Sequence, residues 1–416
     1  MKNRILPQIN INRLEQMLSD FAQIGKTDKG GVTRLTLTKA DQQARDLLIS
    51  ISKTAGFKVR IDNFGNIFIR RNGLEDLPVV MTGSHGDSQP RGGRYDGIYG
   101  VLAGLEVLLT LNDFNIQTRH PIELVMWTNE EGSRFAPAMM GSAIFTEQLE
   151  IETAYKIKDK DGISVKEALE KIGYIGTDKV IGQPIKAVIE AHIEQGPILE
   201  LNNQTIGIVT GAFGQRWFEV KLTGLAMHAG TTPVNMRQDA ILGMAHCIVA
   251  LNRLALKPSS NDVRLTVGMI TASPNSRNVV ADEAFFTIDM RHYDADLLAD
   301  LEIQLRSELT SIADQLNLNI NIQRVLSMPA IHFDEQCIDA VRKAVTKNHY
   351  ASREMISGAG HDACHLSTIA PTSMIFIPCI KGLSHNESEA ITTEWCQAGA
   401  NVLLDTLLIL AENGGD

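Results

Sequence analysis

A small set of histidines and carboxylates, widely separated along the chain, has the side chains needed to bind a pair of divalent metal ions. Such a site needs imidazoles, terminal carboxylates and one carboxylate that bridges the two ions. A further carboxylate outside the ion ligands can act as a general base. The residues that fit these places are His85, Asp96, Glu130, Glu131, His192 and His385.

The first histidine lies where a predicted strand ends. Residues 77–83 form a short apolar run that predicts a buried strand, and His85 and Asp87 follow it. Residues two apart on an extended chain project to the same side. We therefore expect the His85 imidazole to bind a metal ion while Asp87 holds its other ring N–H.

The three acidic residues follow turns or strands, and each has an ordinary structural alternative. Asp96 lies in a glycine-rich turn that enters a helix, and taken alone it fits a helix N-cap. Glu130 and Glu131 close the strand 122–128, and they also fit a solvated acidic turn. If they belong to a site, one can bind metal while the other takes a proton from water.

The two remaining histidines also follow strands. His192 ends the predicted strand 185–193, where a polar end group is a common alternative, and His385 lies in a polar loop after the strand 372–378. Ligands of α/β sheets gather at the carboxyl edge of the strands. The shared placement of these residues therefore predicts one site at that edge.

The periodicity of apolar residues predicts helices and strands that alternate along the chain and form two domains. Helical patterns cover residues 11–24, 39–55, 97–111 and 392–412, and residues 58–61 and 66–69 resemble a hairpin. Between residues 217 and 325 the order changes to strand, helix, two strands, helix and strand, which is the split βαβ arrangement of a ferredoxin-like sandwich. We therefore predict an α/β domain with a mixed sheet, formed by residues 1–211 and 328–416, and an inserted domain of residues 212–327.

Composition narrows the class of protein. The 416 residues carry a net charge of −10 and show no basic stripe, which argues against nucleic-acid binding. The apolar stretch 101–111 is interrupted by Glu106, and residues 1–8 lack the apolar region of a leader, so we expect a cytoplasmic protein without a membrane segment. The five cysteines form no Cys-x-x-Cys pair and are expected to be buried thiols.

Seven short motifs contain these residues and a few others. They are Gly-Ser-His-Gly-Asp-Ser at 83–88, Gly-Gly-Arg-Tyr-Asp-Gly at 92–97, Thr-Asn-Glu-Glu-Gly at 128–132, His-Ile-Glu-Gln-Gly-Pro at 192–197, His-Ala-Gly-Thr-Thr-Pro at 228–233, Gly-Ala-Gly-His-Asp-Ala at 358–363 and Ser-His-Asn at 384–386. In type and order they resemble the motifs of the hydantoinase/carbamoylase group of the dinuclear zinc aminoacylase and carboxypeptidase superfamily. That group includes N-carbamoyl-L-amino acid hydrolases, β-ureidopropionases and allantoate amidohydrolases.

The resemblance implies two divalent ions per subunit, which could be zinc, manganese, cobalt or nickel. It makes His85, Asp96 and His192 ligands of one or both ions, with Asp96 bridging, and it makes Glu131 and His385 ligands of the second ion. Glu130 would be the general base and Asp87 the residue that orients His85. One departure is Gly86, where relatives usually carry a bulkier apolar residue. A glycine there could loosen the backbone that presents His85 and Asp87.

The resemblance also implies a substrate with a ureido group and a carboxylate. Arg291 and Asn278 would bind the carboxylate, Gln195 would recognise the ureido group, and His228 would stabilise the oxyanion. A loop with Gly358, Ala359 and His361 would also contact the substrate. Without the resemblance, Arg291 fits a salt-bridge partner at a strand edge and His228 fits a turn or capping histidine.

The expected fold is a phosphorylase/hydrolase-like catalytic domain with an inserted ferredoxin-like α+β domain that serves as lid and dimerisation domain, so a homodimer is implied. The expected reaction is hydrolysis of an N-carbamoyl-L-amino acid to the amino acid, ammonia and carbon dioxide. Three alternatives stay open: another ureide amidohydrolase acting on allantoate or an N-carbamoyl β-amino acid, a dipeptidase or aminoacylase, and a metal-free binding protein that keeps the scaffold.

Overall fold

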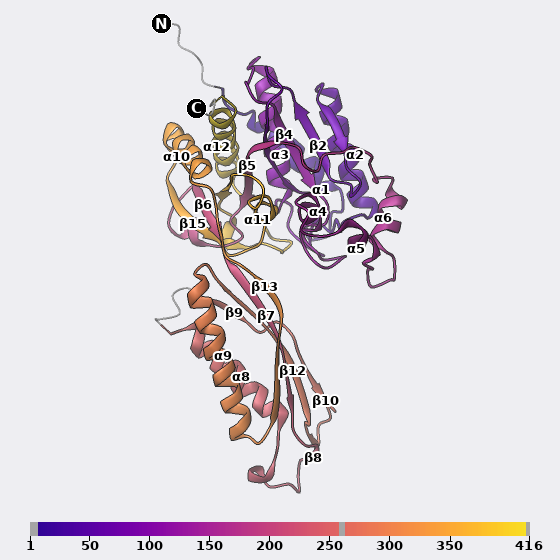
Figure 1. Ribbon diagram of the computed structural model, residues 1–416, viewed down its shortest axis with the longest axis vertical. Helices are drawn as coiled ribbons and strands as arrows, with labels where there is room; N and C mark the ends of the chain where they lie inside the picture. Colours follow the sequence, from indigo (N-terminus) through magenta and orange to yellow (C-terminus); the bar gives the residue numbers. More distant parts are fainter. Residues whose placement is uncertain (1–6, 258–262, 413–416) are drawn as a thin grey trace. The chain divides into compact units, whose positions relative to one another are not determined.

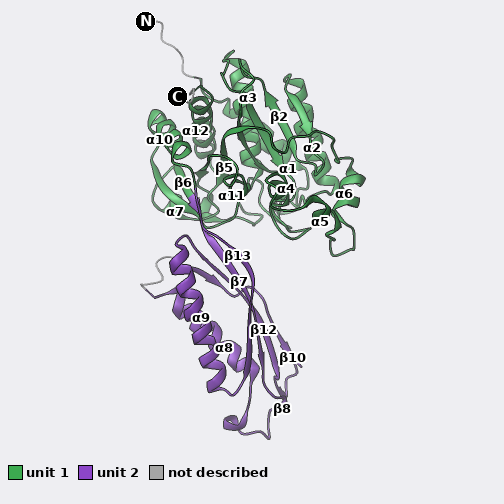
Figure 2. Ribbon diagram, viewed as in Figure 1, with its two compact units in different colours: residues 1–210, 333–416 green, residues 211–332 purple. Residues whose placement is uncertain are grey.

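The computed structural model describes residues 7–257 and 263–412, so most of the N-terminal segment considered above lies outside the described residues (Figure 1). The chain forms two compact units (Figure 2): unit 1, residues 1–210 and 333–416, and unit 2, residues 211–332. The sequence places the second boundary after residue 327. In the structure, unit 2 extends to His332 because Ile331 and His332 pair with Ala212 and Gly211.

Unit 1 is built on a mixed sheet, as predicted. Strand β3 pairs in parallel with β4 and β5, and β5 pairs in parallel with β16, whereas β2–β4 and β16–β6 are antiparallel. The strand order is β1 (Lys58–Ile61), β2 (Ile67–Arg71), β4 (Ile122–Trp127), β3 (Val79–His85), β5 (Ile185–Ile193), β16 (Thr372–Ile377) and β6 (Ile206–Ala212), with β15 (Ser352–Ser357) also on β6. The two-residue strand β14 (Ile331–His332) pairs with the last two residues of β6, which belong to unit 2.

Helices cover this sheet on both faces, because alternate residues of its buried strands point in opposite directions. The helix α3 (Ile98–Asp113) packs on β3 and β5 and on α12 (Thr393–Glu412), together with α1 (Ile11–Gln23) and α10 (Glu335–Asn348). On the other face, Phe145 and Leu366 pack against Met81 and Val125. They belong to the short helices α4 (Met140–Phe145) and α11 (Asp362–Leu366).

The other helices of unit 1 are peripheral. They are α2 (Lys39–Thr54), which contacts β1, and the short helices α5 (Ile151–Lys156), α6 (Val165–Ile172) and α7 (Ile198–Leu201). Local sequence explains their starts. The Thr38 side chain caps α2 by accepting from Asp41 N, and Ser164 and Glu167 form a reciprocal capping box at α6.

Unit 2 has the predicted order of two helices and four main strands. The strands are β7 (Gly214–Thr223), β10 (Ile270–Ser273), β12 (Glu283–His292) and β13 (Asn319–Met328), and the helices are α8 (Ala240–Ala255) and α9 (Ala295–Gln315). The sheet order β10–β12–β7–β13, with β9 (Arg264–Thr266) also on β12, is that of a ferredoxin-like sandwich. Both helices pack on one face, over the alternating side chains Phe218, Val220, Leu222, Phe286 and Ile288.

Two further observations bear on the predictions from composition. All five cysteines are buried and free of disulfides. Within residues 7–257 and 263–412, no helix combines the length and the apolar character that a membrane-spanning segment requires.

Candidate metal centre

The predicted ligands come together in unit 1, at the carboxyl ends of four neighbouring strands. His85 is the last residue of β3 and His192 is the penultimate residue of β5. Glu130 and Glu131 follow β4, and His385 follows β16. Since β4, β3, β5 and β16 are adjacent and parallel, their carboxyl ends meet at one edge of the sheet.

Asp96 joins two groups of donor atoms. Its Oδ1 lies 3.3 Å from His192 Nε2 and 4.0 Å from His85 Nε2, and its Oδ2 lies 3.1 Å from His385 Nε2. His385 Nε2 is also 3.4 Å from Glu131 Oε2. The donor atoms of His85, Asp96 and His192 lie within 4.8 Å of one another, as do those of Asp96, Glu131 and His385. One carboxylate is therefore shared by two groups, each of which could hold an ion.

The N-cap interpretation of Asp96 is wrong. The N-cap of α3 is Gly97, with a φ of 66°, and no side chain caps this helix. A Cβ atom at Gly97 would lie 2.3 Å from ring atoms of His85, so only glycine allows the imidazole to approach this turn. Gly97 occupies the N-cap position of α3, and the Asp96 side chain instead contacts His192 and His385.

Backbone carbonyl groups fix the orientation of the two buried imidazoles. His85 Nδ1 lies 3.0 Å from the carbonyl oxygen of Asp87 and 3.7 Å from its carboxylate, and His192 Nδ1 lies 2.9 Å from the carbonyl oxygen of Ile193. With Nδ1–H donating in each ring, Nε2 keeps its lone pair and faces Asp96. The Asp87 carboxylate has another role, because it accepts from the backbone N–H groups of Glu130 and Glu131.

The electrostatics suit bound cations. Burial lowers the pKa of His85 to about 4, which keeps this imidazole neutral. Burial, and then the charge of Asp96, raises the pKa of Glu131 to about 8, while burial, and then the charges of Asp362 and Glu131, holds that of Glu130 well above its usual range. Within the described part of the chain, Asp96, Glu130 and Glu131 form ion pairs with histidines alone. Divalent ions would compensate this concentration of acidic groups.

Glu130 lies beside the ligand groups without belonging to either. Its Oε2 is 3.5 Å from His85 Nε2, and it is buried. The adjacent Glu131 is held in place by Gln89, which donates to Glu131 from its backbone N–H (2.9 Å) and its side chain (2.8 Å). The two neighbouring carboxylates thus have different surroundings, as a division between metal ligand and proton carrier requires.

Gln195 and His385 both adopt left-handed backbone conformations, with φ of 57° and 53°. Non-glycine residues adopt this conformation rarely, and often at functional sites. The Gln195 side chain donates to both carboxylate oxygens of Asp96, each at 3.2 Å, and to the Ser384 hydroxyl. Its amide therefore lies directly at the ligand cluster.

Two residues of this site were not predicted from the sequence. Ser384 Oγ lies 3.2 Å from Asp96 Oδ2, and Glu389 accepts from the backbone N–H groups of Tyr95 and Asp96. Ser384 belongs to a matched motif and could have been assigned from it. Glu389 carries no local signal, because its hydrogen bonds depend on how one loop packs on another.

The loop with Gly358, Ala359 and His361 turns inward. His361 Nε2 lies 3.0 Å from Ser357 Oγ, and its ring packs edge-on against that of His192, with 4.7 Å between centroids. Its pKa is held well below the usual range by burial. Ala359 is placed by Ser357, whose hydroxyl bonds both its N–H and its carbonyl oxygen. The structure thus brings His361 to the ligand cluster, and its contact with substrate stays a prediction.

The other predicted substrate residues belong to unit 2, and they fall into two separate places. His228 and Asn278 are neighbours, because β8 (Met227–His228) pairs with β11 (Val279–Val280) and Ala229 N donates to Asn278 O. Arg291 pairs with Asp289 at 2.7 Å, near the other end of β12. The eight residue steps from Glu283 to Arg291 along β12 span about 26 Å at the usual rise of a strand.

Gly86 has a structural explanation. A Cβ atom at this position would lie 2.6 Å from the Met126 sulfur atom, so the methionine of the neighbouring strand occupies the space of a larger side chain. The Gly86 carbonyl also accepts from the buried Arg34 guanidinium at 2.5 Å. The backbone between His85 and Asp87 is thus hydrogen-bonded to Arg34 and lies against Met126.

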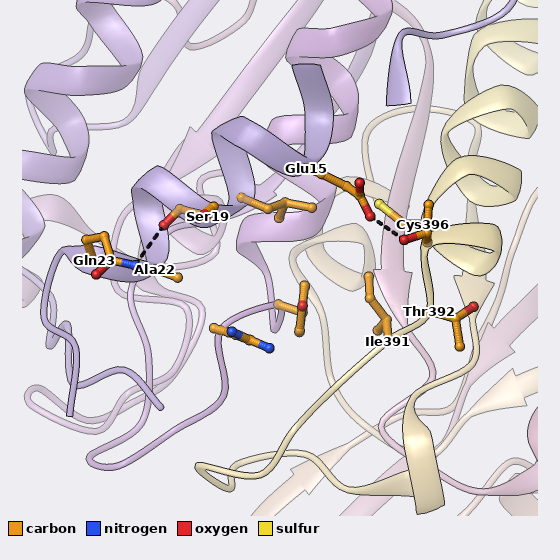
Figure 3. A pocket seen from close by; sticks show the side chains of 11 residues that line it. Glu15, Ser19, Ala22, Gln23, Ile391, Thr392 and Cys396 are labelled. Atoms are coloured by element: carbon orange, nitrogen blue, oxygen red, sulfur yellow. Dashed lines mark hydrogen bonds between the residues drawn. The ribbon is translucent and has the colours of Figure 1, made fainter. Parts of the chain in front are cut away.

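A cavity of about 300 Å³ lies elsewhere in unit 1, between α1 and the start of α12 (Figure 3). Glu15, Ser19 and Gln23 line it from α1, and Thr392 and Cys396 line it from the other side. It includes none of the predicted ligands. Two of its lining residues, Arg94 and Tyr95, belong to the same loop as Asp96. The chemistry therefore belongs to the ligand cluster.

The fold and this cluster of possible metal ligands are typical of a hydrolase, and comparison with known proteins agrees. Residues 81–409 match the model of the Peptidase family M20/M25/M40. The chain therefore belongs to this family of hydrolases. The resemblance seen in the sequence motifs is confirmed.

Within the family, the chain is similar to amidohydrolases over nearly its whole length. It is 42% identical over 406 residues to the N-carbamoyl-L-amino-acid amidohydrolase of Rhizobium meliloti, covering 97% of each chain. It is 33% identical over 408 residues to the allantoate amidohydrolase of Bacillus subtilis, covering 96% of this chain and 98% of the relative. The crystal structure of a hydantoinase/carbamoylase family amidase from Burkholderia multivorans matches with a TM-score of 0.92 and 48% identity, covering 97% of this chain and 98% of that chain.

Proposed function

We propose that the protein is an amidohydrolase that uses two divalent metal ions to hydrolyse N-carbamoyl-L-amino acids. The observation that carries the proposal is the shared carboxylate of Asp96, which lies between the group of His85 and His192 and the group of Glu131 and His385. Imidazole and carboxylate donors suit zinc, manganese, cobalt or nickel. A relative that is 42% identical carries the name N-carbamoyl-L-amino-acid amidohydrolase, and this supports a substrate with a ureido group.

The ions would polarise the ureido carbonyl and lower the pKa of the attacking water. Glu130 takes a proton from this water while the water oxygen attacks the ureido carbon. The bond between that carbon and the nitrogen of the amino acid breaks, and Glu130 delivers the proton to the leaving nitrogen. The products are the amino acid and carbamic acid, which decomposes to ammonia and carbon dioxide. Asp87 supports this step by holding the backbone N–H groups of Glu130 and Glu131.

His228 has the hydrogen-bonding pattern of an oxyanion donor. Its Nδ1 accepts from the backbone N–H groups of Gly230 (3.0 Å) and Thr231 (3.2 Å), which places the ring proton on Nε2. The side chain is exposed, so this N–H can reach a substrate. We assign it to the negative charge that develops on the ureido oxygen, a contribution typically worth about 3 kcal/mol.

The separation of Arg291 from His228 and Asn278 supports a homodimer. Arg291 lies about 26 Å along β12 from Glu283, and β11, which pairs with His228, precedes that end of the strand. A small substrate cannot contact both places within one subunit. If Arg291 and Asn278 bind one carboxylate and His228 stabilises the oxyanion, as the motifs imply, then Arg291 comes from a different subunit than Asn278 and His228. Arg291 must then exchange Asp289 for the substrate carboxylate, which a bidentate guanidinium can bind equally well.

A second candidate is another ureide, since a relative acts on allantoate, as its name states. The test is ammonia release from N-carbamoyl-L-amino acids, N-carbamoyl-β-alanine and allantoate, with release of free amino acids from a dipeptide as the control reaction. Each is assayed after chelation and after reloading with zinc, manganese, cobalt or nickel. We expect release from an N-carbamoyl-L-amino acid that chelation abolishes and a metal restores. Cleavage of dipeptides alone, or full activity without metal, would reject the proposal.

A further inference from the structure

The buried carboxylate of Glu389 is hydrogen-bonded to the backbone that carries the bridging ligand. Its Oε1 accepts from Tyr95 N at 2.8 Å and from Asp96 N at 3.1 Å, and its Oε2 lies 3.3 Å from the Ser384 hydroxyl. Glu389 is only 2% exposed. A carboxylate in this position therefore bonds the loop before α3 to the loop after β16 at two points.

Both loops carry a predicted metal ligand. Asp96 belongs to the first loop and His385, next to Ser384, to the second, and their side chains lie 3.1 Å apart. The Ser384 hydroxyl also lies 3.2 Å from Asp96 Oδ2, so it sits between the two carboxylates. Moving the Glu389 carboxylate would release the Asp96 amide and Ser384 together.

An ordinary structural role as an ion-pair partner does not explain Glu389. Among the described residues, no lysine or arginine forms an ion pair with it. Its partners are two backbone N–H groups and one hydroxyl, all adjacent to the ligand loops. Burying a carboxylate with these partners alone is costly, so its presence points to a role at the ligands.

Gly93 makes room for this carboxylate. A Cβ atom at Gly93 would lie 1.9 Å from the carboxyl carbon of Glu389 and about as close to both of its oxygens. The backbone conformation of Gly93 suits other residues, because its φ lies outside the left-handed region. The glycine is therefore needed for space, and replacing it by alanine must displace the carboxylate while leaving Glu389 itself unchanged.

From these contacts we infer that Glu389 is a positioning residue, which sets the geometry of Asp96 and His385 for the second metal ion. The inference rests on the proposed metal centre. Partners behind metal ligands typically change ion affinity by roughly 10- to 100-fold when removed. The expected effect is thus on ion binding, before any substrate is present.

The experiment is a titration of metal-free protein with Co²⁺, followed by its absorption spectrum, which reports both affinity and ligand geometry. The variants are Glu389→Ala, Glu389→Gln, Gly93→Ala and the double variant Gly93→Ala/Glu389→Ala. Glu106→Ala is the matched control, because it removes another buried carboxylate of unit 1, paired with Arg13. Thermal melting of each metal-free variant identifies those that fold.

We expect Glu389→Ala and Gly93→Ala each to weaken the second ion by roughly 10-fold or more and to change its spectrum. Glu389→Gln keeps an acceptor for the two amides and should bind nearly as the wild type does. The double variant should bind no worse than Glu389→Ala, because both changes remove the same contacts. The Glu106→Ala control should lower the melting temperature and leave the affinity intact.

The outcomes separate this inference from the proposed function. If the wild type binds no Co²⁺, the metal centre itself is wrong and the inference fails with it. If the wild type binds two ions and folded Glu389→Ala binds them with equal affinity and spectrum, the inference alone is overturned. Additive losses in the double variant would also overturn it, since they would assign separate effects to Gly93 and Glu389.

Discussion

His385 Nε2 lies 3.1 Å from Asp96 Oδ2, although the two residues come from the two separate segments that form unit 1. This contact, with burial acting against it, raises the pKa of His385 to about 9. The side chain of His385 is 48% exposed, whereas those of His85 and His192 are 3% and 1% exposed. The ion at His385 is therefore expected to be the more accessible of the two.

Replacing His385 by alanine should weaken one ion and spare the other. The group of His85, Asp96 and His192 remains complete, so roughly one ion per chain should survive gel filtration instead of two. Metal analysis by atomic absorption measures this. His246→Ala, in α8 of unit 2, is the control and should keep the wild-type content. Loss of both ions from a folded His385→Ala variant would show that the two groups do not bind independently.

Replacing Glu130 by glutamine should abolish turnover without loss of metal. The glutamine keeps the shape of the side chain and cannot carry the proton, and general-base catalysis is worth about 10²- to 10⁴-fold in rate. Steady-state ammonia release and metal content are measured on the same preparation. Glu147→Gln, an exposed residue at the end of α4, provides the control. A fully active Glu130→Gln enzyme would contradict the assignment.

Replacing Gly86 by leucine should destabilise unit 1 by forcing Met126 out of its place. A Cβ atom there already lies 2.6 Å from the Met126 sulfur atom, and such overpacking costs about 1–3 kcal/mol. Urea unfolding of the metal-free protein measures the free energy. Adding Met126→Ala should recover part of the loss, because it vacates the space. A Gly86→Leu variant as stable as wild type would mean that Met126 moves without cost.

The stability of the metal-free protein should fall as the pH drops from about 6.5 to about 4, in part because of His365. Burial lowers the pKa of this imidazole to about 4, and its Nδ1 lies 3.0 Å from Ser142 Oγ. Its pKa in the unfolded chain is about 6.5, so the unfolded chain takes up the proton first as pH falls. This proton uptake lowers the free energy of unfolding by up to about 3 kcal/mol below pH 4.

His365→Gln removes this titration and should flatten the pH dependence over that interval. Unfolding curves at a series of pH values, with chelator present throughout, compare the two proteins. His349→Gln, at the exposed C-terminal end of α10, is the matched control and should keep the wild-type slope. Parallel curves for wild type and His365→Gln would exclude a contribution from His365.

Local sequence was enough to predict the elements and most of the side chains that the structure brings together at the candidate site. The apolar runs that form β3, β4, β5 and β16 are short, continuous and bounded by polar residues, so their ends, and with them His85 and His192, could be read directly. The βαββαβ order of unit 2 followed in the same way from alternating residues in β7 and β12. Periodicity records which face of an element is buried, and this needs no knowledge of its partner.

Only the tertiary structure decided what depends on packing between distant segments. Asp96 fits an N-cap from its sequence, and its contact with His385 becomes visible only when the two loops lie together. Glu389 carries no local signal at all, and the separation of Arg291 from His228 depends on strand register. Hydrogen bonds and ion contacts act over about 3–4 Å, so residue type and spacing supply the groups, while the folded backbone alone brings them within reach.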